Sequence, residues 1–435
     1  MTFDSKRGLV ATALLAAAMS FYFYGLLIPQ VRVGMREQNR AGGYYCGNDL
    51  YPIWLTTGDL LASRTNPYSM TTEHRIETGL YGRPLDRSNR SDRAINYRGF
   101  SYPLYTDVLA IPLSFLSFRS VQIFLSILFP ILIVRSVNWW CAGIGVPLSR
   151  VAFTNAALLT LFSIPVLEGW WALQPTIIVG VLLAATLAAL RRNALGLAGI
   201  ALALGSVKPQ LIVLPAFWLA VWAVSDWPRR RRLIFALAVT TIVLLVLSEI
   251  WLPTWWLSWW HQLPNYRQFD SPPLVELNFG KLIGRVLGLA ALCLGVVACF
   301  RWRRLPADSS GFSLLFAFLL AAGVVFISSS IAVYDQFLLA PGLLVLWRDR
   351  QTVLSNRMMR FATFVLCLAF FWPWVAAPTV SVIHMISPAV VSDKVILLPL
   401  LTAASFPLLL LSVLSMLVLK TMRDTPTEST AIVRD

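Results

Sequence analysis

One acidic residue, Asp49, lies in a polar stretch just after the first long apolar segment of the chain. Aromatic residues surround it in the sequence, including Tyr51 and Trp54. A carboxylate held near a membrane surface among aromatic rings is suited to act as a general base toward a hydroxyl group. A helix cap or a partner for a nearby arginine is the alternative role for a single loop aspartate.

Two other charged residues interrupt apolar sequence. Lys208 stands between two apolar runs and directly precedes Pro209. A charge within a membrane segment is costly and is therefore a functional candidate by default, while snorkelling of the side chain to the interface is the other explanation. Asp335 follows Tyr334 at the start of another apolar segment, where it could serve as a counter-charge at a helix N-terminus.

Further polar residues between the apolar segments could hold a ligand by charge, hydrogen bonding or stacking. They are Arg98, Tyr102, Gln174, His261 and Asn278. His261 follows four tryptophans, which are typical of the interfacial belt of a membrane protein. No CxxC pair or His-Cys cluster points to a metal ion, and the chain has no phosphate loop, GxGxxG, HExxH or DxD motif. We therefore expect neither a metal nor a cofactor.

The composition indicates the class of protein in which these residues lie. Hydrophobic residues make up 57% of the 435 residues, charged residues make up 13%, and the mean hydropathy is +0.68. Soluble domains carry about 25% charged residues, so the sequence predicts an all-α polytopic membrane protein. The net charge of +15 does not indicate a nucleic-acid partner, because the basic residues cluster in short segments between apolar runs. That positive-inside pattern predicts cytoplasmic N- and C-termini in a plasma (inner) membrane.

Twelve apolar segments are predicted to cross the membrane. They are 9–29, 120–140, 151–167, 174–190, 194–207, 209–225, 233–251, 282–300, 312–330, 334–347, 361–377 and 394–419. This threading places the arginine clusters in the cytoplasm and leaves over the segment 103–118, which we predict to be an interfacial or re-entrant helix. A competing solution makes 103–118 a full span and merges 194–207 with 209–225.

The threading also divides the chain between the two sides of the membrane. Residues 30–103 are predicted to form a large outer loop that carries short interfacial helices. Residues 1–423 are predicted to form a single integral-membrane domain, and 424–435 a disordered cytoplasmic tail. The unusual polar residues gather on the outer face, where we expect a monomer to meet its substrates among membrane lipids.

An ordered series of short motifs carries a family resemblance that covers the chain from about residue 9 to residue 350. In chain order they are Asp49-Leu50 with Trp54, Gly58, Leu61 and Asn66-Pro67-Tyr68; Phe100-Ser101-Tyr102-Pro103-Leu104; Trp171-Ala172-Leu173-Gln174-Pro175; Ser206-Val207-Lys208-Pro209-Gln210; and Leu277-Asn278-Phe279-Gly280. Through this series the chain resembles the lipid-carrier-dependent glycosyltransferases of the GT-C superfamily. Within it, the resemblance is to the polyprenol-phosphate-mannose-dependent α-mannosyltransferases of actinobacteria. The segment 330–336 lacks the tryptophan and paired histidines that are usual there. The resemblance therefore does not imply that the donor sugar is mannose.

The resemblance implies a GT-C-like bundle that moves a hexose from a polyprenyl-phosphate sugar to a lipid or glycan acceptor at the outer face. The first-loop aspartate of the family acts as the general base of an inverting transfer, and here it is Asp49. A retaining route would need a second carboxylate as nucleophile, for which Asp335 is the candidate. Lys208 and Arg98 are assigned to the donor phosphate. The residues assigned to substrate binding are Tyr51, Trp54, Tyr102, Gln174, His261, Asn278, Tyr334 and Asp335.

Other functions stay open. A secondary transporter would be indicated by inverted repeats and by broken helices that meet near the middle of the membrane, and we find neither in the sequence. A lipid flippase or an O-antigen-ligase-like glycan transferase is the closer alternative. Ligases of that kind typically use outer-loop arginines and a histidine rather than an aspartate.

Overall fold

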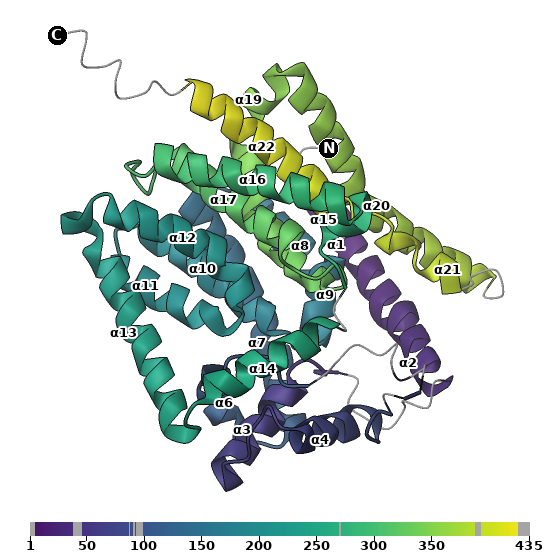
Figure 1. Ribbon diagram of the computed structural model, residues 1–435. Coiled ribbons are helices and arrows are strands. Elements are labelled where there is room, and N and C mark those ends of the chain that lie inside the picture. The colour runs from purple at the N-terminus through teal and green to yellow at the C-terminus, as the bar shows by residue number, and fades with distance from the viewer. Residues whose placement is uncertain are drawn as a thin grey trace.

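The computed structural model describes residues 5–37, 46–86, 88–89, 92, 99–268, 271–387 and 393–424. The predicted site residue Arg98 lies outside these ranges, as does the predicted tail beyond residue 424. The described part of the chain is all-α (Figure 1), and its only strand-like pairing is an isolated bridge between Pro273 and Ser329.

The helices follow one another through short connections. The first half of the chain contains α1 (Lys6–Phe21), the π-helical η1 (Tyr22–Leu27), α2 (Ile28–Glu37), α3 (Tyr51–Ser63), α4 (Met70–Tyr81), α6 (Tyr105–Ser114), α7 (Phe118–Ile144), α8 (Arg150–Leu161), α9 (Ile164–Trp171), α10 (Pro175–Arg191), α11 (Leu195–Leu204) and the 3-10 turn η2 (Gly205–Val207). The second half contains α12 (Pro209–Val224), α13 (Trp227–Trp251), α14 (Trp255–Gln268), α15 (Leu274–Phe279), α16 (Lys281–Arg301), α17 (Ser310–Phe326), the 3-10 helix η3 (Val333–Leu339), α18 (Ala340–Arg348), α19 (Arg350–Ser355), α20 (Arg357–Ile386), α21 (Asp393–Ile396), η5 (Leu398–Leu400) and α22 (Phe406–Asp424). Serine side chains begin several of them, since Ser117, Ser149 and Ser309 each accept an N–H from the first turn of the next helix.

Six helical segments among the described residues are long and apolar enough to cross a membrane. They are Lys6–Gly34, Phe118–Ile144, Trp227–Trp251, Lys281–Arg301, Arg357–Ile386 and Phe406–Asp424. A seventh is added if α8 and α9, which meet at a bend of 59°, are counted as one broken span. This is the pattern of a multi-pass membrane protein.

The outer surface of the bundle is apolar over long stretches. On α13, at the edge of the bundle in Figure 1, the exposed fractions of Phe235, Val239 and Ile250 are 55%, 60% and 60%. On α16 the exposed fraction of Leu282 is 78% and that of Leu289 is 65%. Soluble proteins rarely expose apolar patches of this extent, whereas lipid chains are a suitable solvent for them.

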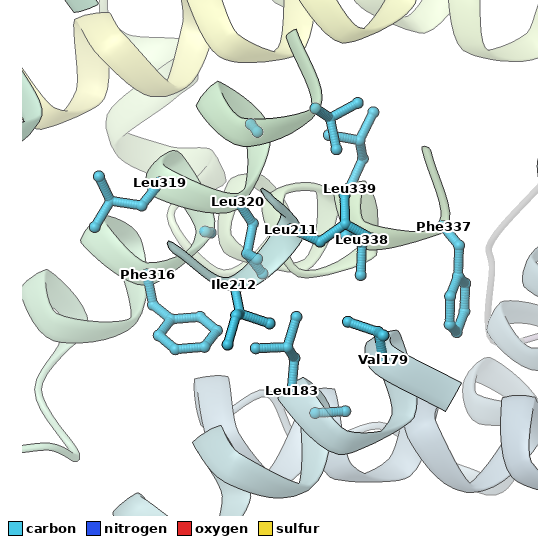
Figure 2. Packing of buried hydrophobic residues seen from close by; sticks show 14 of the residues in the cluster. Val179, Leu183, Leu211, Ile212, Phe316, Leu319, Leu320, Phe337, Leu338 and Leu339 are labelled. Carbon is cyan, nitrogen blue, oxygen red and sulfur yellow. The ribbon is translucent and has the colours of Figure 1, made fainter. Parts of the chain in front are cut away.

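Helix α17 forms the centre of the bundle. Every residue from Gly311 to Val325 is buried, as expected for a helix that is apolar on all sides. α17 packs against α12, α16, α18, α22 and η3. Figure 2 shows part of this core, in which Phe316 and Leu320 of α17 meet Ile212 of α12 and residues of η3.

Arginine side chains join the helix ends on one side of the bundle. They donate to backbone carbonyls of neighbouring turns: Arg191 to residue 308 at 3.0 Å, Arg230 to residue 303 at 2.9 Å, Arg301 to residue 422 at 2.9 Å and Arg348 to residue 310 at 3.0 Å. We call this side the arginine end. The clusters that are separate in the sequence therefore gather at one end, as the threading from the sequence requires.

Each of the twelve segments predicted to cross the membrane contains helix, but not all of them are single α-helices. The segment 151–167 is broken between α8 and α9, 334–347 is η3 followed by α18, and 394–419 includes α21, η5 and a turn before α22. Several of these helices are short, however, including α10, α11 with η2, α12 and α17, each with 10 to 17 residues. Helices α10 and α17 are largely buried, whereas α11 and α12 also expose apolar residues such as Leu197 and Val224. Hydropathy alone therefore does not separate enclosed helices from true spans. Six or seven spans follow from length and composition, and the count of twelve stays a prediction. The left-over segment 103–118 contains α6, which at 10 residues is too short to cross a bilayer.

A fully buried carboxyl group, that of Asp107 on α6, joins this helix to α3. Its Oδ1 lies 3.0 Å from the hydroxyl of Thr56 and 3.3 Å from that of Thr57. Both hydroxyls lie closer to backbone carbonyls of their own helix, at 2.8 and 2.7 Å. Each hydroxyl carries one proton, which is shared between the carbonyl and the carboxyl, and Oδ2 of Asp107 has no partner among the described residues. Burial raises the pKa of Asp107 well above its usual range, although the threonine contacts oppose the shift.

We predict that Asp107→Asn tolerates alkaline pH better than the native protein. A carboxyl whose pKa is raised in the folded state binds a proton that the unfolded chain releases above about pH 4. The free energy of unfolding of the native protein therefore decreases as the pH rises toward the raised pKa. The Asp107→Asn variant has no carboxyl group at this position and does not lose that stability. Thermal unfolding of both proteins in detergent at pH 5 and pH 8 measures this difference in stability. An advantage of the native protein over the variant that grew with pH would show that Asp107 is ionised.

Candidate functional site

A cavity of about 600 Å³ opens at the end of the bundle away from the arginines. Helix α10 runs from this cavity, at Gln174 and Pro175, to Arg191 at the arginine end. Helix ends and connections form the walls, and the short helices α3, α4, α6 and α14 gather at the same end (Figure 1). The polar lining residues are Asn48, Asp49, Ser101, Tyr102, Glu168, Gln174, Lys208, Gln210, Ser328, Ser329, Tyr334 and Asp335.

The loop that carries Asp49 is fixed by its backbone to the turn between α9 and α10. The N–H of Gly47 donates to the carbonyl of Trp171 at 2.8 Å, and the N–H of Asp49 donates to that of Ala172 at 3.2 Å. Gly47 has a φ of +74°, and a Cβ at this position would lie 2.9 Å from a methyl carbon of Leu173. Both the backbone conformation and the close approach therefore require glycine beside Asp49.

Gln174 orients the Asp49 carboxylate. Its Nε2 donates to Asp49 Oδ2 at 2.5 Å, and its Oε1 accepts from the hydroxyl of Tyr102 at 3.4 Å. The preceding residue, Leu173, has a φ of +50°, which is uncommon for a residue with a side chain. Backbone strain of this kind is retained where the surrounding structure fixes it, often at functional sites. The turn thus delivers a buried amide to the carboxylate.

Lys208 reaches the cavity from the break between η2 and α12. Its Nζ donates to Thr176 Oγ1 at 2.7 Å and lies 3.4 Å from Asp335 Oδ1, which also accepts from Thr176 at 2.6 Å. The ammonium lies 4.8 Å from the centre of the Tyr334 ring. The side chains of Lys208 and Asp335 are 8% and 4% exposed. Each charge therefore provides the compensation that the other needs in a buried site.

The start of helix α10 joins the two polar groups of the cavity, because Gln174 immediately precedes the helix and Thr176 lies in its first turn. Its approach to η3 depends on Gly180, where a Cβ would lie 2.4 Å from the ring of Phe337. On the other side of η3, Gln336 donates to the carbonyl of residue 403 at 2.7 Å. These contacts fix η3 so that the carboxylate of Asp335 lies beside the ammonium of Lys208.

Four aromatic side chains complete the walls: Tyr102, Trp171, Trp259 and Tyr334. The indole N–H of Trp259 donates to the carbonyl of Ser101 at 2.9 Å, which ties α14 to the segment before α6. Aromatic rings offer broad apolar faces with polar edges. A ligand with both apolar faces and hydroxyl groups suits such a lining.

Six of the residues predicted from the sequence line the cavity together. They are Asp49, Tyr102, Gln174, Lys208, Tyr334 and Asp335, which come from parts of the chain up to 286 residues apart. Arg98 lies outside the described residues. The convergence of these residues is a property of the fold, since the sequence places them on separate segments.

Four predicted residues do not line the cavity. The ring of Tyr51 packs against the ring of residue 118, and the indole of Trp54 donates to the carbonyl of residue 116 at 3.0 Å, so both hold α3 in place. Asn278 donates to a carbonyl within its own helix, α15, at 2.8 Å. His261 is exposed, because the face of α14 that reaches the cavity carries Trp259 and residue 263.

Sequence reasoning misses Thr176, which contacts both charges of the buried pair. One signal of it exists, because Thr176 is a polar residue in the first turn of an otherwise apolar helix, two positions after Gln174. Asn48 and Ser328 are missed as well, and their types carry no comparable signal. They are discussed below.

The cavity thus combines an oriented carboxylate, a buried cation and aromatic faces. Among the described residues, no group of three or more His, Cys, Asp or Glu side chains gathers as metal ligands would. Comparisons with protein-family models, with curated proteins and with solved structures find no match for this chain. The residues of the cavity themselves therefore define the chemistry that the site can perform.

We predict that the buried pair is strongly coupled. Lys208→Met should cost about 3–5 kcal/mol of unfolding free energy, because it leaves a buried carboxylate without its cation. The double variant with Asp335→Leu removes both charges and should recover most of that loss. Denaturation in detergent micelles measures all three variants as a double-mutant cycle. Simple additivity of the two single effects would contradict the coupling.

Proposed function

We propose that this protein is a membrane glycosyltransferase that moves a hexose from a polyprenyl-phosphate sugar to a hydroxyl of a lipid or glycan acceptor. The observation that carries the proposal is a single cavity with an oriented carboxylate, Asp49, and a buried cation, Lys208. Such a transfer requires both groups: a base for the attacking hydroxyl and a positive charge for the departing phosphate.

Asp49 accepts the proton of the acceptor hydroxyl as that oxygen bonds to the anomeric carbon. The bond from the anomeric carbon to the phosphate oxygen breaks in the same step, and the phosphate leaves with the electron pair. Gln174 keeps the carboxylate in one orientation, and Tyr102 in turn holds the Gln174 amide. Positioning of this kind contributes to rate by holding the reacting groups in a productive geometry.

We propose a single, inverting displacement rather than a retaining route through Asp335. Retention would require a second carboxylate as nucleophile, and Asp335 was the sequence candidate. Its Oδ1 accepts from both Thr176 and Lys208 and is buried with them. A carboxylate engaged in this way is a counter-ion rather than a nucleophile.

The charge of the cavity favours a donor with one phosphate. Among the described lining residues Lys208 is the one cation, against the carboxylates of Asp49, Glu168 and Asp335. Two of the three ammonium protons meet Thr176 and Asp335, and the third is available to a phosphate oxygen. A sugar phosphodiester carries one negative charge. A diphosphate would bring additional negative charge, for which the described lining residues provide no second cation.

A second, apolar cavity supports a donor that carries a lipid. It has a volume of about 120 Å³ and is lined by residues of α8, α9, η3, α18, α20 and α22. Helix α9 runs from Ile164 in this cavity to Trp171 in the first, and η3 passes from Asp335 in the first to Phe337 in the second. A head group at Lys208 would therefore leave its hydrocarbon chain beside an apolar recess.

The motifs that resemble the GT-C family support the same proposal. Residues from four of the five line the cavity, namely the motif that begins at Asp49 and the segments 100–104, 171–175 and 206–210. In that family the helices form one bundle around an outer active site, and we propose twelve crossings here, with the short enclosed helices included. The arginine end then faces the cytoplasm by the positive-inside rule, together with both termini. The cavity faces the outer side of the plasma membrane.

We predict that the two ends differ in access from outside the cell. Ser88→Cys, in the exposed loop after α4, should react with an impermeant maleimide in intact cells, whereas Ser355→Cys, exposed at the arginine end, should react only after permeabilisation. Cys46, Cys293 and Cys367 are replaced first, because they are not buried. Labelling of both positions in intact cells would contradict the orientation.

We predict that Asp49→Asn abolishes transfer without unfolding the protein. Asparagine can still accept from Gln174 through its Oδ1, but it cannot take a proton, so the rate should fall by about 10²–10⁴-fold. Asp49→Glu displaces the base and should leave a small residual rate. A cell-free assay with a panel of polyprenyl-phosphate sugars and a membrane lipid extract measures turnover.

Asp59→Asn is the matched control for this prediction. Asp59 is a carboxylate of α3 that pairs with Arg75 outside the cavity, and its loss should change turnover little. Surface pairs of this type contribute about 0–1 kcal/mol to stability. Undiminished transfer by Asp49→Asn would remove Asp49 from the chemistry and the proposed mechanism with it.

A further inference from the structure

Two polar atoms in the wall of the cavity have no hydrogen-bond partner among the described residues. They are Oδ1 of Asn48 and Oγ of Ser328. Both residues line the cavity, and Ser328 is 4% exposed. Buried polar atoms are nearly always paired, so each unpaired one needs an explanation.

The backbone around each atom is fixed by bonds to other elements. Asn48 lies between Gly47 and Asp49, which both donate to the turn between α9 and α10. The N–H of Ser328 donates to Gly323 at 3.1 Å, and that of Ser330 donates to the carbonyl of residue 272 at 3.1 Å. Because the segments are held in this way, the two side chains keep fixed places in the wall of the cavity.

The chemistry of the two atoms defines the group that they can bind. The amide oxygen of Asn48 only accepts, whereas the hydroxyl of Ser328 can donate and accept. Both are neutral, so they complement hydroxyl groups rather than the anion that Lys208 attracts. Other unpaired buried atoms, such as Oγ1 of Thr106 and Nε1 of Trp218, do not line the cavity. An unpaired buried atom therefore indicates a binding site only where its residue also lines the cavity.

We propose that Asn48 and Ser328 bind hydroxyl groups of a sugar ring in the cavity and help to determine which sugar is accepted. The inference rests on the proposed function, because it assigns further specificity residues to the same site. Aromatic faces from Trp171 and Trp259 cover the apolar side of the ring, while these two side chains read its hydroxyls. A site that hydrogen-bonds a hydroxyl discriminates against the analogue that lacks it.

The test combines two variants with deoxy substrates. Asn48→Ala and Ser328→Ala should each lower kcat/KM by about tenfold with the fully hydroxylated donor and acceptor. One deoxy analogue lacks the sugar hydroxyl that the replaced side chain binds. With that analogue, the variant and the native protein should have the same kcat/KM. A series of deoxy donors and a series of deoxy acceptors show which of the two rings is bound.

Thr106→Val is the matched control, because it removes an unpaired buried hydroxyl outside the cavity. It should leave both kcat/KM and the deoxy discrimination unchanged. Unfolding temperatures separate binding from folding, since loss of an unpaired hydroxyl in Ser328→Ala should not destabilise the protein. Native discrimination between deoxy analogues in both alanine variants would overturn the inference and leave the proposed function intact.

Binding can be followed without turnover. The cavity tryptophans should report a neutral alkyl glycoside by a change in fluorescence, and both alanine variants should weaken that binding about tenfold. If the native protein transfers no sugar but binds the glycoside in this manner, the proposed function fails and the inference stands. If the native protein neither transfers nor binds, the inference is overturned as well.

Discussion

The Lys208 ammonium and the Asp335 carboxylate lie 3.4 Å apart in a bundle whose surrounding helices are almost wholly apolar, and the site is arranged around keeping them together. Neither charge is tolerable there alone. Their pairing requires that α11 be interrupted by η2 before α12, and that η3 enter the bundle beside α10. Thr176 bridges the two charges from the first turn of α10, so a single helix start connects this pair to Gln174 and Asp49.

The cavity is built where helices begin, end or break. In an apolar surrounding, non-helical backbone is acceptable only where it is enclosed by protein or lines a polar space. The turn at Leu173, the η2 break and the segment before η3 satisfy that condition, because all three border the cavity. Loops at the opposite end satisfy it through arginine side chains that donate to backbone carbonyls. The two ends thus meet the same constraint by different means, and the cavity end does so around a space that can hold a ligand.

Much of this arrangement can be anticipated from the sequence, for definite reasons. A charge between apolar runs is expensive, so Lys208 is conspicuous, and each predicted apolar segment contains helix. The partner of Lys208 is not predictable, because Asp335 is 127 residues away and would equally suit a helix N-terminus. His261 and Asn278 show the limit of local pattern, since a run of tryptophans does not tell which face of α14 turns inward. Hydropathy likewise cannot separate an enclosed helix such as α17 from a lipid-facing one such as α13.

The burial of α17 bears on how the protein is made. This helix is enclosed by α7, α12, α16, α18 and α22, of which the first three are synthesised before it and the last two after it. Helices α7 and α12 therefore cannot adopt their final packing until residues 310–326 have arrived between them and their later neighbours. Most of the walls around Asp49 and Lys208 belong to earlier parts of the chain, whereas the wall at Ser328, Tyr334 and Asp335 and the support from α18 and α22 follow α17. Insertion of the chain into the bilayer and assembly of the site are consequently separate events in the biogenesis of this protein.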